Sequence, residues 1–216
     1  MDNLIIPKKP RTYIPQNLKM EWANLEPIFD ELLKRDINSV EELEKWLADK
    51  SELEAALEED FAWRYIKMSC DTANENLVKD FQYFATEIEP KISPVANELN
   101  KKFSESPFVD SLDQQQYFVY IRAVKKALEL YREENIELFI QLQVAQQKYQ
   151  GITGAMSVTI NEQEYTLEQA ANFLKDTNRD VRAQAWQTIQ QRRLVDKDEL
   201  NILFDELIAM RHKVAL

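Results

Sequence analysis

Glycine is almost absent from this sequence, and this scarcity constrains the fold more than any other feature. The 216 residues include only two glycines, Gly151 and Gly154. Tight turns, phosphate-binding loops and dinucleotide-binding fingerprints need glycine where the backbone approaches a ligand closely or adopts a positive φ angle. The sequence therefore argues against a sheet-rich fold and against glycine-rich nucleotide sites. Because both glycines follow a long helical pattern, we expect a left-handed cap to end that helix there.

Helical periodicity accounts for most of the chain. Apolar residues recur three and four positions apart in successive runs, with turn signals between the runs. The clearest runs are Leu77, Phe81, Phe84 and Ile88; Ile92, Val95, Leu99 and Phe103; and Tyr117, Ile121, Val124 and Leu128. We predict a mainly α-helical protein with no internal repeat of constant length. The tryptophans lie among apolar positions and are expected to be mostly in the core: Trp22, Trp46, Trp63 and Trp186.

One short segment departs from the helical pattern. Residues 156–160 alternate apolar and polar side chains, residues 161–164 form a polar four-residue tip, and residues 164–166 continue as a second extended run. Thr166 then begins a helix through a capping box, in which its hydroxyl accepts from the Gln169 N–H and the Gln169 side chain reaches back. The predicted fold class is thus a multi-helix, mainly α protein with one short β-hairpin.

The charge of the chain excludes several classes of partner. Its formal net charge is −11, which opposes binding to the phosphates of nucleic acids and to anionic membrane surfaces. No apolar run approaches the roughly 20 residues that cross a bilayer, and the first residues lack the apolar region of a signal peptide. The single cysteine, Cys70, excludes an internal disulfide framework. We predict a cytoplasmic protein without nucleic acid or membrane partners.

Several motifs occur in the order found in one family of peptidases. The hairpin leads into T-L-E-Q-A-A-x-F-L from Thr166, then D-x-x-R-x-x-R-x-x-A-W from Asp176 and L-F-D-E-L-I-A-x-R-H from Leu203. Upstream stand S-x-x-E-L-E-x-W-L from Ser39, K-M-S-C-D-T-A-N-E-N at 67–76 and E-I-E-P-K-I at 87–92. By their order and spacing, the sequence resembles the N-terminal half of the oligoendopeptidase F family of thimet-like zinc metallopeptidases. The hairpin tip departs from that pattern, because relatives often carry a glycine there.

The resemblance implies that the chain is part of a larger enzyme. Members of the family are zinc metallo-oligopeptidases that hydrolyse short peptides, and their H-E-x-x-H helix lies downstream of the matched segment. This chain would form one wall of the substrate channel, with short peptides and the catalytic lobe of the same polypeptide as its partners. We expect an extended arm at 1–16, a helical subdomain at 17–150, the hairpin and helices of the family's N-terminal domain at 151–195, and the truncated start of the catalytic lobe at 196–216.

The last helical pattern leads to the same expectation. Leu200, Leu203, Leu207 and Val214 continue at helical spacing without a stop signal, so we expect the chain to be the front part of a longer protein. Leu203, Leu207 and Val214 would then be partly exposed, or be covered by a second copy through self-association of the fragment.

The residues present do not make a catalytic zinc site. Such a site needs two histidines one helical turn apart, a glutamate beside the first and a further acidic ligand. The only histidine is His212, and its neighbours at i−4 and i+3 are Ile208 and Ala215, which also excludes the E-x-x-H ligands of a di-iron bundle. Cys70 has no histidine base nearby in sequence, and we expect it to be a small buried residue. We therefore assign zinc to the full-length parent, and no catalytic, cofactor-binding or metal-binding residue to this segment.

Arginines and tyrosines are the remaining candidates for contact with a substrate. Arg179 and Arg182, like the pair Arg192-Arg193, could hold a peptide carboxylate, although aspartates near Arg179 and Arg182 can pair with them instead. Tyr149 and Tyr165 have the amphipathic character that suits a peptide groove. We assign Arg179, Arg182, Tyr149 and Tyr165 to the substrate wall. The alternative function is a free-standing helical scaffold or protein-interaction module without catalysis, for which no downstream H-E-x-x-H helix is required.

Overall fold

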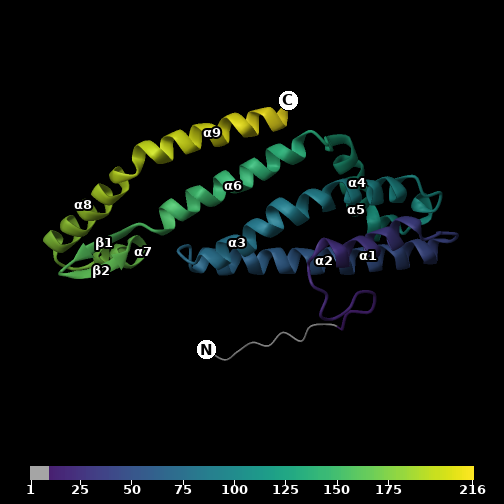
Figure 1. Cartoon of the computed structure of the whole chain (residues 1–216), viewed down its shortest axis with the longest axis horizontal. Coiled ribbons are helices and arrows are strands. Elements are labelled where there is room, and N and C mark those ends of the chain that lie inside the picture. Colours follow the sequence, from purple (N-terminus) through teal and green to yellow (C-terminus); the bar gives the residue numbers. More distant parts are fainter. Residues whose placement is uncertain (1–9) are drawn as a thin grey trace. The chain divides into compact units, whose positions relative to one another are not determined.

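The computed structural model describes residues 10–216 (Figure 1). Over this range the chain is mainly α-helical with one antiparallel two-stranded hairpin, which confirms the predicted fold class. The elements in chain order are α1 (Trp22–Lys34), α2 (Val40–Cys70), α3 (Glu75–Tyr83), η1 (Phe84–Ile88), α4 (Glu89–Ser104), η2 (Val109–Ser111), α5 (Gln114–Leu130), α6 (Asn135–Gly154), β1 (Ser157–Ile160), β2 (Gln163–Thr166), α7 (Leu167–Ala170), η3 (Ala171–Lys175), α8 (Arg179–Val195) and α9 (Lys197–Ala215). Within the described range, no helix combines the length and apolar character that crossing a membrane requires.

The chain divides into two compact units. Of the described residues, the first unit contains 10–64 and 83–133, and the second contains 65–82 and 134–216. The boundaries expected from the sequence stay a prediction, and residues 1–9 of the expected arm lie outside the described residues.

The core of the first unit contains side chains from α1, α2, α4 and α5. Leu25 and Leu32 of α1 and Trp46 of α2 are fully buried, and the Trp46 indole N–H donates to the Leu32 carbonyl at 2.9 Å. Lys102 of α4 also binds the end of α1, because its ammonium donates to the carbonyls of Leu32, Leu33 and Arg35. The last carbonyls of a helix have no partner within the helix. Trp46 and Lys102 therefore supply to the end of α1 the hydrogen bonds that a further turn would have supplied.

The segment before α1 is held by one carboxylate. The backbone N–H groups of Thr12, Tyr13 and Ile14 donate to the Glu52 carboxylate of α2 at 2.9, 2.8 and 2.9 Å. The Thr12 hydroxyl donates to the same group, and the Ile14 side chain is buried in the core of the first unit. Glu52 therefore fixes the path of a segment that has no regular secondary structure of its own.

Two expectations about buried and turning residues are wrong. Trp46 is buried, but Trp63 and Trp186 are 53% and 57% exposed, so tryptophan is less confined to the core than the pattern indicated. Gly151 and Gly154 both lie inside α6, and neither has a positive φ angle. Gly154 instead permits a close approach, since a Cβ there would lie 3.2 Å from the Thr72 side chain.

Helices α6 and α9 pack side by side and antiparallel in the second unit (Figure 1). The Asn135 amide donates to the Val214 carbonyl at 3.1 Å, and at the other end Lys148 pairs with Glu199 at 3.3 Å. Leu203 and Leu207 are buried within this unit, with only 3% and 4% of their surface exposed. The expected exposure of these leucines is therefore wrong, because α6 of the same chain provides the surface that a partner was expected to provide. The exposed apolar residues of α9 lie on its other faces: Ile202, Phe204 and Ile208.

The β-hairpin is tighter than the sequence indicated. Ile160 pairs directly with Gln163, so the connection has two residues, Asn161 and Glu162, and not four. Both have positive φ angles, 52° and 66°, which is the conformation of a type I′ turn. The predicted capping box at Thr166 is confirmed, with reciprocal hydrogen bonds between Thr166 and Gln169.

Replacing Glu162 by glycine is expected to stabilise the hairpin by about 0.5–1 kcal/mol, because glycine adopts the left-handed conformation without the steric cost that a Cβ imposes. Denaturant unfolding of the 216-residue chain measures the effect. Gln163→Gly is the matched control, because Gln163 lies in extended backbone of β2, where glycine destabilises. A loss of stability in both variants would contradict the turn assignment.

Candidate pocket in the second unit

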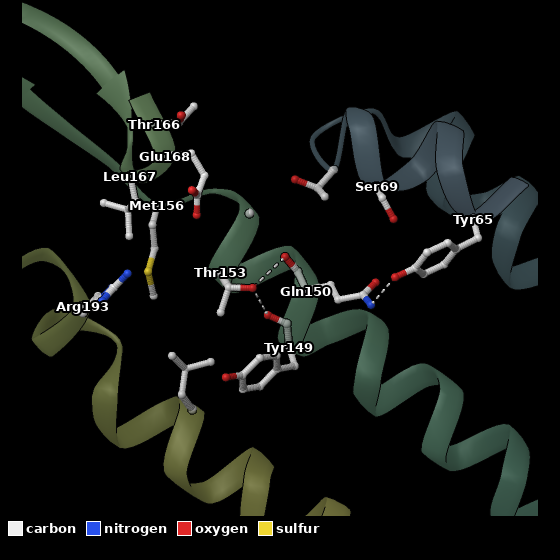
Figure 2. A pocket seen from close by; sticks show the side chains of 13 residues that line it. Tyr65, Ser69, Tyr149, Gln150, Thr153, Met156, Thr166, Leu167, Glu168 and Arg193 are labelled. Carbon is white, nitrogen blue, oxygen red and sulfur yellow. Dashed lines mark hydrogen bonds between the residues drawn. The ribbon is translucent and has the colours of Figure 1, made fainter. Parts of the chain in front are cut away.

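A pocket of about 600 Å³ lies entirely within the second unit (Figure 2). Its wall is formed by the last turns of α2, the end of α6, the start of α7, the end of α8 and the start of α9. Met156, Leu167 and Leu200 are its apolar lining residues, and Met156 is buried. The volume falls within the range of about 300–1,000 Å³ that is usual for small-molecule sites.

Hydrogen bonds hold the polar side of the pocket in place. The Gln150 amide donates to the Tyr65 hydroxyl at 3.0 Å, which links α6 to the end of α2. The Thr153 hydroxyl donates to the carbonyls of Tyr149 and Gln150, one turn earlier in α6. Figure 2 shows Tyr149 and Thr153 on the same stretch of helix beside the cavity. The last turns of α6 thus carry an ordered set of hydroxyl and amide groups.

Two opposite charges face this pocket. Glu168 lies in the first turn of α7 and Arg193 in the last turn of α8, where the partial charges of helix ends favour an acid and a base respectively. In Figure 2 they lie on either side of Met156. Within the described part of the chain, neither has a hydrogen-bond or ion-pair partner. The adjacent Arg192, in contrast, is paired with Asp196.

The four residues assigned to a substrate wall have different surroundings. Tyr149 lines the pocket. Tyr165 belongs to the small core under the hairpin, where its ring meets Phe173 edge-on at 5.2 Å and its hydroxyl donates to Gln163. The Arg182 guanidinium donates to the carbonyls of Asp176 and Thr177, directly after η3, at 2.7 and 3.0 Å. Arg179 is exposed at the start of α8. Of these four described residues, only Tyr149 contributes to the pocket, and contact with a substrate stays a prediction.

Glu168 and Arg193 were not assigned to a site from the sequence, although the sequence contains a partial signal for them. The pair Arg192-Arg193 was visible as two adjacent bases, but the sequence does not say which one is neutralised. Glu168 is inside the capping-box motif that predicted α7, and nothing in that motif separates a helix-stabilising acid from one that faces a cavity. Bringing α7, α8 and α6 around one pocket depends on tertiary packing.

The side chains of residues 10–216 do not form a site that fits a zinc ion. His212 is exposed on α9, and within residues 10–216 no group of three or more histidine, cysteine, aspartate or glutamate side chains is placed to hold a metal. Cys70 is exposed at the end of α2, so its expected burial is wrong. Met68, two residues earlier, takes the buried position instead.

The family model described as the peptidase M3 N-terminal domain matches residues 18–131, which is more than half of the 216-residue chain. The chain belongs to this family. It carries the N-terminal domain of an M3 peptidase, which confirms the peptidase resemblance that the order of its motifs indicated. No curated protein matches the sequence.

Solved structures share the fold of this M3 N-terminal domain. A protein named provisionally as an oligoendopeptidase F has a TM-score of 0.82 at 22% identity, over 90% of this chain and 35% of its own. PZ peptidase A, solved with an inhibitor, has a TM-score of 0.81 at 19% identity, over 90% and 35% of the two chains. A provisionally named oligoendopeptidase F from Bacillus anthracis has a TM-score of 0.81 at 20% identity, over 95% and 39%. The chain thus spans little more than a third of the length of these proteins.

Proposed function

We propose that this chain forms one wall of the substrate channel in a cytoplasmic zinc metallo-oligopeptidase that hydrolyses short peptides. The match of residues 18–131 to the peptidase M3 N-terminal domain carries the proposal. The fold that the chain shares with oligoendopeptidases supports it. Because no group of residues within 10–216 fits a metal ion, we place the zinc ligands and the water-activating glutamate in an H-E-x-x-H helix downstream.

The role of this segment is to limit and orient substrates. A wall of packed helices restricts access to extended, short peptides, and its polar side chains, including Tyr149 and Arg179, offer contacts to the peptide backbone and termini. The catalytic lobe of the same polypeptide would cover exposed apolar surface of this segment. Phe204 and Ile208, one helical turn apart on α9, are 51% and 50% exposed and form the best candidate for that contact. In the isolated fragment, the same surface would support self-association.

Reading the coding sequence downstream of Leu216 tests the proposal directly. We expect an H-E-x-x-H helix downstream, and we expect the full-length protein to cleave a short fluorogenic peptide until a zinc chelator is added. Glutamine in place of the glutamate of that motif should abolish cleavage while preserving the fold, because the base that activates water is lost.

The 216-residue chain alone provides the matched control. It should show no peptidase turnover and no stoichiometric zinc binding, since it lacks the ligand set that makes such sites strong. Chelator-sensitive cleavage by the pure chain would contradict the division of roles. A downstream sequence without H-E-x-x-H would favour the alternative, a helical scaffold without catalysis.

A further inference from the structure

We propose that the pocket of the second unit binds a small zwitterion, an α-amino acid or short peptide with free termini, whose ammonium group meets Glu168 and whose carboxylate meets Arg193. The proposal rests on the proposed function in one respect, because peptide hydrolysis is what would supply such molecules beside this site. The recognition of the zwitterion itself depends on the residues that line the pocket.

Glu168 and Arg193 both line the pocket, yet they are not paired with each other or with any other residue of the described range. Two neighbouring ion pairs lie outside the pocket lining: Arg192 with Asp196, and Lys148 with Glu199. A carboxylate and a guanidinium that face one cavity without contact leave room for a molecule that carries the complementary pair of charges.

Apolar side chains line the pocket between the two charged groups. Met156, Leu167 and Leu200 offer apolar surface, and Figure 2 places Met156 between the two charged groups. The Tyr149 hydroxyl lies on the same cavity and can hydrogen-bond to a peptide group or a carboxylate. This arrangement suits an apolar side chain on a backbone with free ends. An anion alone would be repelled by Glu168, and a cation alone by Arg193.

The experiment titrates the 216-residue chain with leucyl-leucine and with free leucine, while nuclear magnetic resonance follows the Met156 methyl group and the amides of residues 149–156. Blocked analogues separate the two charges: acetyl-leucyl-leucine lacks the ammonium, and leucyl-leucinamide lacks the carboxylate. Each blocked analogue should bind about three- to ten-fold more weakly than leucyl-leucine, as expected for one charge-assisted contact at a solvent-exposed site. Comparing leucyl-leucine with leucine distinguishes a peptide from a free amino acid as the preferred source of the zwitterion.

Single substitutions test the two proposed contacts, at Arg193 and at Glu168, separately. Arg193→Gln should remove the preference for leucyl-leucine over its amide and leave the preference over the acetylated form. Glu168→Gln should do the reverse. Arg211→Gln, exposed on α9 and outside the pocket lining, and Glu162→Gln, at the hairpin tip, change charge equally and should alter neither preference.

The proposal is overturned if leucyl-leucine and the blocked forms bind equally, if none of them shifts these resonances, or if the control variants act like the pocket variants. Its failure is separable from failure of the proposed function. If the full-length enzyme hydrolyses peptides but the 216-residue chain does not bind zwitterions, only this inference fails. If the chain binds zwitterions but no H-E-x-x-H helix lies downstream, only the proposed peptidase function fails.

Discussion

Replacing Trp46 by alanine is expected to lower the free energy of unfolding of the first unit by about 3–5 kcal/mol. Trp46 is fully buried, so truncation leaves a cavity among Leu25, Leu32 and the neighbouring side chains. It also removes the indole donor from the Leu32 carbonyl and the aromatic face beneath the Lys102 ammonium, which lies 5.9 Å from the ring centre. The Leu32 carbonyl keeps its hydrogen bond from Lys102, so the loss of one of its two donors adds modestly to the cost of the cavity.

Urea unfolding of the 216-residue chain, followed by circular dichroism, measures this loss. Trp46→Phe should have an intermediate cost, because it keeps most of the volume and loses the hydrogen bond. Trp186→Ala is the matched control: this residue is 57% exposed, so its loss should change the stability by less than about 0.5 kcal/mol. Equal effects of the two alanine substitutions would contradict the distinction between core and surface tryptophans.

Local patterns predicted the elements of the fold well. The hairpin and the capping box at Thr166 both depend on residues close together in sequence, and both are present. The two-residue connection was missed because Asn161 and Glu162 both adopt positive φ angles, and glutamate rarely does so. The turn has no glycine at its second position, where type I′ turns favour one, so its type was not predicted.

Properties that depend on which helix packs against which were harder to predict. Leu203 and Leu207 formed an apolar stripe with no visible partner, and the sequence could not show that α6, some 60 residues earlier, would cover it. Arg182 looked able to hold a carboxylate, yet its guanidinium is occupied by the backbone carbonyls of Asp176 and Thr177, directly after η3. The pocket has the same origin, since Tyr65, Tyr149 and Arg193 are distant in sequence.

Replacing Glu52 by alanine is expected to cost about 2–4 kcal/mol at neutral pH, because three backbone N–H groups lose a charged acceptor and two of them are partly buried. The segment from Thr12 to Ile14 should detach, and the buried Ile14 side chain with it. Limited proteolysis should then cut within residues 10–16 of the variant and leave the wild-type chain intact. Glu58→Ala is the control, because Glu58 is exposed on the same helix.

The effect of Glu52 should also depend on pH in one direction. Burial acts to raise the pKa of Glu52, but the N–H groups of Ile14, Thr12 and Tyr13 outweigh it and lower the pKa from 4.5 to about 2. A carboxylate with a depressed pKa in the folded state stabilises fully above its unfolded pKa and loses that contribution as the pH falls toward the folded pKa. The difference in stability between the wild-type chain and Glu52→Ala should therefore be constant above about pH 5 and shrink between about pH 4.5 and 2. Glu31, whose pKa is also about 2 through its hydrogen bond to Arg35, is present in both proteins and cancels from the difference. A difference that stayed constant through this acid range would show that Glu52 does not hold the segment through its charge.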